Sequence, residues 1–181
     1  PTFNATDSGA NNVYSACSAS NASGVSTCTL ASKKAEAKIL SLVTPASVTG
    51  SSVTFIAGAP VLANSSFSVT TPATLTADGS TQAAFTVVLK DANGNPVTGQ
   101  AVSLTASGAS SGASAQSGLS SATGTTDSSG SFTTNLVSTV AETRTVSLAS
   151  PSITSFPTKT ATFVAGAPDP TKSTLVLGTG P

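Results

Sequence analysis

The chain has 181 residues, of which 62 are serine or threonine and only 8% are charged, and it contains no histidine, methionine or tryptophan. Seven basic and seven acidic residues give a net charge of zero, with no basic cluster beyond Lys33 and Lys34, so nucleic acid is not an expected partner. Without histidine no Ser-His-Asp or Cys-His nucleophile can form, and the acidic residues are dispersed, so the sequence predicts neither an enzyme nor a cofactor. No apolar run approaches the ~20 residues that a membrane-spanning helix needs.

The first predicted feature along the chain is a disulfide. Cys17 and Cys28 are the two cysteines, and they flank a turn signal, Asn-Ala-Ser-Gly, at residues 21–24. A metal site would need a histidine or further cysteines, which the chain lacks. A partly buried disulfide across a hairpin is therefore the favoured interpretation, and two free thiols are the alternative. A disulfide indicates an oxidising compartment outside the cytoplasm.

Short strands are expected between residues 66 and 164. Alternating apolar residues, rich in valine and threonine, predict seven of them, at 66–70, 73–77, 83–90, 100–106, 131–137, 143–149 and 159–164. Strands at this spacing suggest a sandwich of two sheets. The expected core consists of Val69, Phe85, Val87, Leu89, Val102, Leu104, Phe132, Leu136, Val146, Leu148 and Phe163. The glycine- and serine-rich stretch 107–118 is expected to be a long loop or a weak strand.

A turn motif separates the predicted strands at 83–90 and 100–106. It consists of Asp91, Asn93, Gly94, Asn95 and Pro96. Asn-Gly accepts the positive φ angles of a hairpin turn, and proline, which has no N–H group, interrupts the ladder. The Asp-x-Asn-x-Asn spacing also opens calcium loops, but proline and valine stand where an EF-hand requires glycine and glutamate. A hairpin turn is preferred and no metal site is predicted, with weak calcium binding by turn carbonyls left open.

The segment KDANGNPVTGQAVSLTAS, which follows a valine-rich strand, resembles the hallmark segment of the group 1 bacterial immunoglobulin-like domains of invasin- and intimin-type surface adhesins. The resemblance covers residues 65–168. It implies an immunoglobulin-like β-sandwich and a location that is extracellular or on the bacterial cell surface. It also implies the mechanical role of a spacer rather than a chemical one.

The sequence also repeats itself. Residues 16–42 align without gaps with 122–148 at an offset of 106, and TFIAGAP ending at Pro60 matches TFVAGAP ending at Pro168 at an offset of 108. The expected organisation is the C-terminal portion of a truncated repeat at 1–60, a complete repeat at 64–168, and a linker with the first strand of a further repeat at 169–181. Extended to the N-terminus, the alignment places Pro1 on about Ser107. Residues 1–60 are then expected to be ordered only when strands from upstream or from another chain complete them.

Two charged pairs recur in the repeat, Glu36 with Lys38 and Glu142 with Arg144. Residues two apart share one face of a strand. These pairs are expected to be exposed charges that protect a sheet edge, with contact to a ligand as the alternative.

The predicted fold class is all-β, with tandem immunoglobulin-like β-sandwich repeats. The favoured function is a stiff stalk whose partners are adjacent repeats of the same polypeptide or of neighbouring chains. One alternative is a filament subunit assembled by strand complementation, and another is a module that binds carbohydrate or a host receptor. The aromatic content of 4% disfavours carbohydrate binding, since sugar-binding surfaces commonly use exposed aromatic rings.

Overall fold

The structure, a computed structural model, describes residues 1–6, 11–72, 74–108 and 118–176. The chain forms two compact units. Unit 1 consists of Pro1–Ser66, Val88–Gln100 and Thr126–Ser131, and unit 2 of Phe67–Val87, Ala101–Thr125 and Phe132–Pro181. The regular structure is almost entirely β, as predicted, with one short 3-10 helix, η2 (Leu62–Asn64), in the described ranges. Within those ranges no helix is long and apolar enough to cross a membrane.

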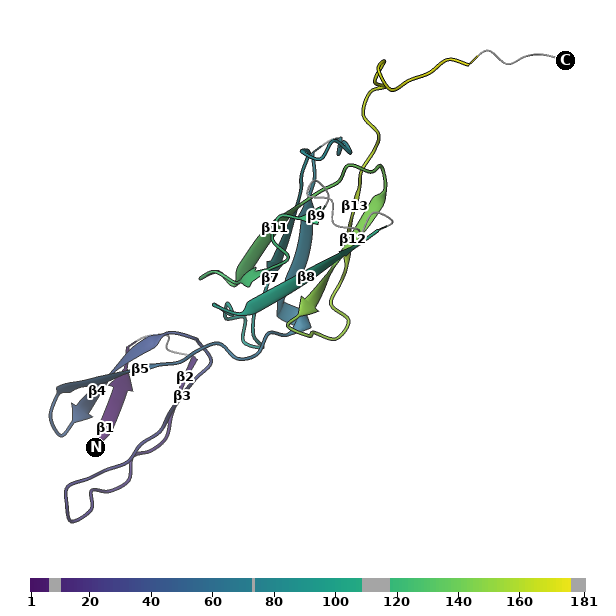
Figure 1. Ribbon diagram of the computed structural model, residues 1–181. Coiled ribbons are helices and arrows are strands. Elements are labelled where there is room, and N and C mark those ends of the chain that lie inside the picture. The colour runs from purple at the N-terminus through teal and green to yellow at the C-terminus, as the bar shows by residue number, and fades with distance from the viewer. Residues whose placement is uncertain (7–10, 73, 109–117, 177–181) are drawn as a thin grey trace. The chain divides into compact units, whose positions relative to one another are not determined.

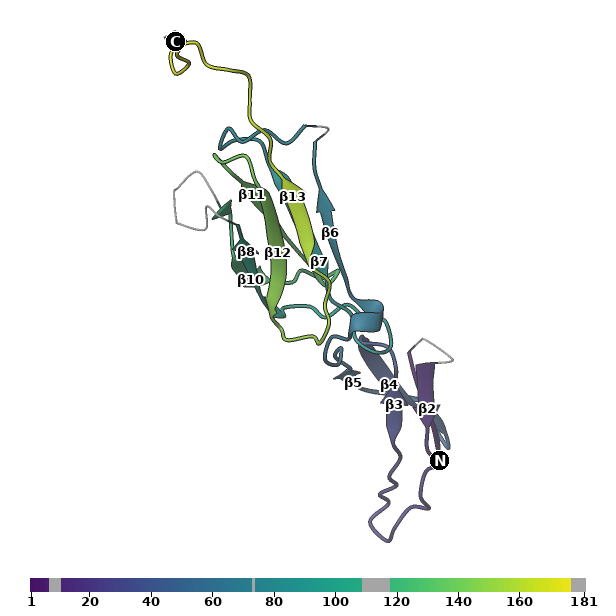
Figure 2. The ribbon, with the colours of Figure 1, turned by 90° about the vertical axis from the view of Figure 1, so that its right-hand side faces the viewer.

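Two four-stranded sheets form the sandwich of unit 2 (Figures 1 and 2). The first has the order β10-β8-β12-β13, formed by Thr123–Thr125, Ala101–Ser107, Thr143–Ser150 and Lys159–Thr162. The second has the order β6-β7-β11-β9, formed by Ser66–Thr70, Ala83–Val88, Ser131–Val137 and Gly118–Leu119, with a terminal residue of β6, β7 and β11 belonging to unit 1. This arrangement confirms the predicted β-sandwich.

Alternate residues of the strands provide the core of unit 2. In β7, Ala83, Phe85 and Val87 are fully buried, and the ring of Phe85 lies 6.0 Å from that of Phe67. The other sheet contributes Val102, Leu104, Val146 and Ala161, each at most 2% exposed. Of the predicted core residues, Val69, Phe132 and Leu148 are only half-buried. The period-two pattern therefore identified the inward face correctly and overestimated burial at these three positions.

The predicted strand at 73–77 is wrong where the structure describes it, because Thr76 forms only an isolated bridge, parallel to Val164. Two short strands, β9 and β10, were not predicted. Strands of two or three residues are too short to show an alternating pattern.

Unit 1 contains a three-stranded sheet, β1-β4-β5, and a two-stranded sheet, β2-β3. The first is formed by Thr2–Ala5, Ala37–Thr44 and Val48–Thr54, and the second by Asn12–Tyr14 and Leu30–Ser32. Much of its apolar surface is open to solvent: every residue of β5 is exposed, and Val13 and Val48 are 61% and 54% exposed.

The strand registers of the two units agree with the sequence repeat. Lys38 of β4 pairs with Val53 of β5, and Arg144 of β12 pairs with Ala161 of β13, which reproduces the offsets of 106 and 108. The same comparison corrects the N-terminal alignment. β1 pairs with β4 (Phe3 with Leu42, Ala5 with Leu40) as β8 pairs with β12 (Leu104 with Leu148, Ala106 with Val146), with a register shift at the same place.

Thr2–Ala5 therefore corresponds to residues 103–106, and the expected match of Pro1 to Ser107 is wrong by about five residues. The connection from β1 to β2 is shorter than that from β8 to β9. A gap-free extension of the alignment cannot detect a length change inside a loop.

Candidate functional site

The predicted turn motif forms a tight hairpin turn, called here the Asp91 turn (residues 91–96). The N–H of Gly94 donates to the Asp91 carbonyl and the N–H of Asp91 to the Asn95 carbonyl, both at 3.0 Å. Oδ1 of Asp91 accepts the N–H groups of Asn93 (2.8 Å) and Asn95 (2.9 Å). Gly94 alone in the turn has a positive φ, +82°, which matches a type I turn followed by a left-handed glycine.

The same turn occurs at Asn21 and at Asp127. Oδ1 of Asn21 accepts the N–H groups of the residues two and four positions on, and Oδ1 of Asp127 does the same, all at 2.8–2.9 Å. Gly24 and Gly130 occupy the left-handed position with φ of +77° and +75°. A short polar side chain followed three residues later by glycine therefore specifies this turn in all three places.

The Asp91 turn differs from the other two because its carboxylate is buried. Asp91 is 4% exposed, whereas Asn21 and Asp127 are exposed. Its second oxygen, Oδ2, accepts the N–H of Gly58 at 3.0 Å and Nδ2 of Asn95 at 2.9 Å. Burial raises the pKa of Asp91, but the hydrogen bonds from Asn95, Gly58 and Asn93 outweigh it, so the net pKa is lowered and the carboxylate stays charged.

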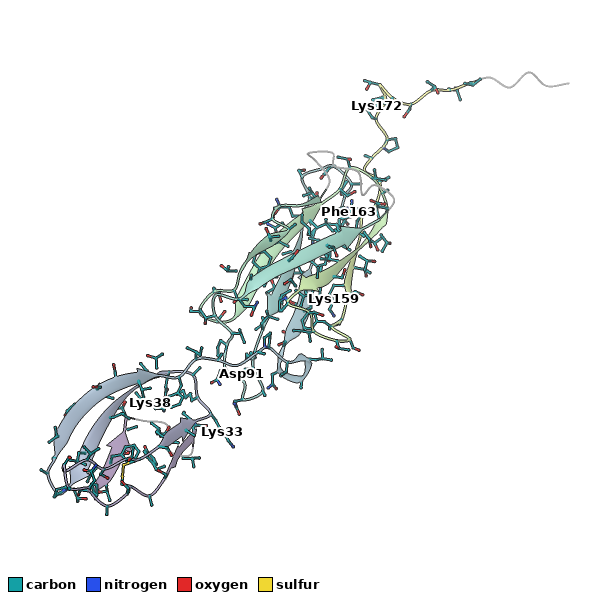
Figure 3. All side chains as sticks on the ribbon, turned by 60° about the horizontal axis from the view of Figure 1, so that its bottom comes forward. Lys33, Lys38, Asp91, Lys159, Phe163 and Lys172 are labelled. Carbon is teal, nitrogen blue, oxygen red and sulfur yellow. A yellow bond between two sulfur atoms is a disulfide. The ribbon has the colours of Figure 1, made fainter. Side chains whose placement is uncertain are left out.

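Asn95 and Asn64 extend this network to other segments of unit 1. Of the residues in the network, Asp91 and Lys33 are labelled in Figure 3. Oδ1 of Asn95 accepts the N–H of Ala35 at 3.0 Å, and its Nδ2 also donates to the Lys33 carbonyl at 2.8 Å. Nδ2 of Asn64 donates to the Asp91 carbonyl at 2.7 Å. The turn thus binds two segments, residues 33–35 and 58–64, that are far from it in the sequence, which no local sequence pattern indicates.

The carboxylate of the Asp91 turn is already fully engaged by N–H donors. The two carboxylate oxygens of Asp91 accept four N–H donors, which occupy the positions that a cation would take. In the described portion of the chain, no three His, Cys, Asp or Glu side chains cluster as a metal site requires.

The predicted disulfide between Cys17 and Cys28 is present, with 4.5 Å between the two Cα atoms. Both cysteines are half-buried, and backbone hydrogen bonds on either side, Ser15 to Thr29 and Ser18 to Thr27, continue the β2-β3 ladder past them. The bond therefore crosses a hairpin that is already paired.

The cation of each recurring pair is buried and its glutamate is half-buried, which contradicts the expectation of exposed edge charges. The side chain of Lys38 is fully buried, with Nζ 2.6 Å from Glu36, and that of Arg144 is 3% exposed, 3.3 Å from Glu142. Lys38 lies on β4 and Arg144 on β12, and each of these strands has a neighbour on both sides. Each cation lies on the inward face of its strand. Next to Arg144 lies Gly108, where an added Cβ would come within 2.6 Å of the arginine side chain.

The binding-module alternative would place its contact at the stretch 107–118 or at an end of the sandwich, and that stretch lies mostly outside the described residues. The structure therefore offers no geometry for a carbohydrate or receptor site there.

Comparison with known proteins gives one family and several related structures. The family model for bacterial Ig-like domains (group 1) matches residues 64–164. InvD of Yersinia pseudotuberculosis is 25% identical with a TM-score of 0.70, over 97% of this chain and 50% of InvD. FdeC, an Escherichia coli adhesin, is 24% identical with a TM-score of 0.58, over 91% of this chain and 53% of FdeC.

Invasin, described as a bacterial integrin-binding protein, is 21% identical with a TM-score of 0.52, over 81% of this chain and 28% of invasin. The likenesses to FdeC and invasin concern the fold alone. The chain spans about half the length of the InvD and FdeC structures and less of invasin. None of the curated proteins matches the sequence.

Proposed function

Since the chain belongs to the group 1 bacterial immunoglobulin-like domains, we propose that it is a stiff spacer of tandem repeats in an adhesin at the bacterial surface. Its partners are then the adjacent immunoglobulin-like repeats of the same polypeptide, and it has no catalytic role. The fold likeness to the adhesin FdeC and to invasin supports this assignment. Receptor binding would belong to other regions of such a protein.

The proposed organisation is a partial repeat at 1–60, a complete repeat at 64–168 and the start of a further repeat at 169–181. Its support is the shared register of β4-β5 and β12-β13 and of β1-β4 and β8-β12. Residues 173–176 are not in a strand, and Leu175 is 100% exposed. A first strand can form only when the rest of its sheet is present to pair with it.

The observation that carries the proposal is the hydrogen-bonded network of the Asp91 turn. By sequence, the turn belongs to the repeat at 64–168, whereas Ala35 and Gly58, which it binds, belong to the repeat at 1–60. Every member of the network lies in unit 1. Hydrogen bonds to an ionised carboxylate are stronger than those between neutral groups. The network therefore restrains the chain where one repeat follows the other, which stiffens the spacer.

Spin-label distances test this stiffness. Labels on cysteines introduced at two exposed positions, Ser52 in β5 and Thr160 in β13, should give a narrow distance distribution in pulsed EPR. The variant Asp91→Ala/Asn95→Ala removes the network and should broaden it. Asp127→Ala is the matched control, because it removes an exposed turn aspartate whose hydrogen bonds stay within its own turn.

Circular dichroism must show that each variant is folded. A wild-type distribution as broad as that of the double variant would refute the stiff spacer. Broadening by Asp127→Ala to the same extent would show that the Asp91 network has no special role in it.

The open face of unit 1 lies where unit 2 has further strands. Leu30 of β3 pairs with Tyr14 as Leu136 of β11 pairs with Leu119, and β11 lies between β7 and β9. Within the described residues, β3 pairs with β2 alone, and Phe3, Leu40, Leu42 and Val48 line an open cavity. We infer that strands like β6 and β7, from elsewhere in the same polypeptide, cover this face.

A chimera tests this inference. Because Thr2 corresponds to Ser103, residues 64–102 placed directly before Thr2 would restore a full repeat, and the thermal midpoint of this repeat should rise. The same chimera with Phe85→Asp and Val87→Asp in the added segment is the control and should give no gain. If the original chain instead forms oligomers in solution that Leu175→Lys disperses, strand complementation between chains would replace this inference.

A further inference from the structure

We infer that the loop at residues 138–141, together with Gly166, forms a second socket for an Asp91-type turn, presented by a further immunoglobulin-like repeat. The inference rests on the proposed tandem arrangement and specifies how one repeat engages the next. The occupant is defined by its chemistry: a turn of sequence Asp-x-Asn-Gly-Asn-Pro that offers a carboxylate and an amide oxygen to two backbone N–H groups.

The occupied socket in unit 1 defines the geometry that such a turn needs. The N–H of Ala35 donates to Asn95, and the N–H of Gly58 donates to Asp91, each at 3.0 Å. The loop that presents Ala35 is shaped by Ser32, whose Oγ accepts the N–H of Lys34 at 3.1 Å and donates to the Lys34 carbonyl at 3.3 Å. The segment leading to Gly58 is fixed next to this loop by the bond from the N–H of Phe55 to the Glu36 carbonyl, 3.0 Å.

Unit 2 repeats each of these shaping contacts. Oγ of Ser138 accepts the N–H of Val140 at 3.1 Å and donates to the Val140 carbonyl at 2.9 Å. The N–H of Phe163 donates to the Glu142 carbonyl at 2.8 Å. At the offsets of 106 and 108, Ala141 therefore stands in the place of Ala35, and Gly166 in the place of Gly58. The loop that positions the donor is already formed in unit 2.

The two sockets differ in the burial of the alanine, whereas Gly58 and Gly166 are both exposed. Ala35, beneath Asn95, is half-buried, whereas Ala141 is exposed. The residues that precede the two alanines differ, Lys33 and Lys34 against Thr139 and Val140. This difference does not matter to recognition, because the turn reads backbone N–H and carbonyl groups and not side chains.

An extended chain tests the socket directly. Residues 1–168 followed by residues 61–181 add a second copy of the repeat with the same connection, because residue 169 aligns with residue 61. Amide hydrogen exchange is measured with ¹⁵N confined to the first 168 residues by segmental ligation. Relative to the original chain, the amides of Ala141 and Gly166 should exchange about five- to tenfold more slowly, the factor that corresponds to one net hydrogen bond.

Ala35 and Gly58 serve as internal standards, since they are already engaged. Asp91→Ala/Asn95→Ala in the added copy alone should abolish the new protection, and Asp127→Ala in that copy should leave it unchanged. An added copy that is folded but leaves Ala141 and Gly166 as fast as before would overturn the socket. Failure of the spacer proposal would be seen elsewhere, as a broad spin-label distribution in the original chain.

Discussion

Truncating Phe85 to alanine tests the strand register on which the core of unit 2 depends. Phe85 is completely buried in β7, its ring lies 6.0 Å from that of Phe67, and the ring of Phe67 lies 6.2 Å from that of Phe156. Removing a buried phenyl group costs about 3–5 kcal/mol, because the lost burial is compounded by the cavity that remains. This is a large share of the roughly 5–15 kcal/mol that stabilises a typical domain.

At about 4–8 °C per kcal/mol for a domain of this size, the thermal midpoint of unit 2 should fall by more than about 12 °C. Differential scanning calorimetry measures the change, and Thr86→Ala is the control on the adjacent residue. Thr86 points to the other face of β7, where its hydroxyl lies 2.9 Å from that of Thr133, and its loss should cost about 1 kcal/mol. Equal effects of the two substitutions would refute the assigned burial. Hydrogen exchange in the β2-β3 hairpin should be little affected, since separate cores unfold semi-independently.

Three further changes have distinct expected outcomes. Replacing Cys17 and Cys28 by serine should lower the stability of unit 1 by about 3 kcal/mol, because the unfolded chain gains conformational entropy. Urea unfolding should show this as a lower midpoint. Free thiols in the wild-type protein before reduction would contradict the bond. Hydrogen bonds lower the pKa of Asp91 in the folded chain. The stabilising effect of the charged carboxylate is therefore complete above the unfolded pKa of about 3.9 and is lost as the pH falls through the lower folded value. The wild type should consequently lose more stability on acidification than Asp91→Asn. Gly130→Ala and Gly24→Ala both force alanine into a left-handed conformation, which should lower stability by about 1 kcal/mol each. Only at Gly130 does the new methyl group meet the Leu89 carbonyl, which should cost roughly 1–3 kcal/mol more. Equal shifts of the thermal midpoint would disprove that contact.

Local sequence patterns were sufficient for the turn, the disulfide and six strands of the sandwich, β6, β7, β8, β11, β12 and β13. β6 and β11 begin and end at the predicted residues, and β7, β8, β12 and β13 differ from prediction by one or two residues at their ends. This agreement has a physical basis: alternation along a strand reflects which face is buried, and an Asp or Asn followed by glycine fixes a turn through bonds to its own backbone. The cysteine spacing similarly placed the bridge across a hairpin.

Features that depend on contacts between distant segments could not be obtained in this way. A charged residue in a strand was expected to be exposed, and only the sheet order shows that Lys38 and Arg144 lie on inner strands with a glutamate within reach. The role of the Asp91 turn depends on bonds to Gly58 and Ala35, which lie 33 and 60 residues away in the sequence from the residues that bind them. The local sequence determines the shape of that turn. The fold alone brings the N–H of Gly58 to Oδ2 of Asp91 and the N–H of Ala35 to Oδ1 of Asn95.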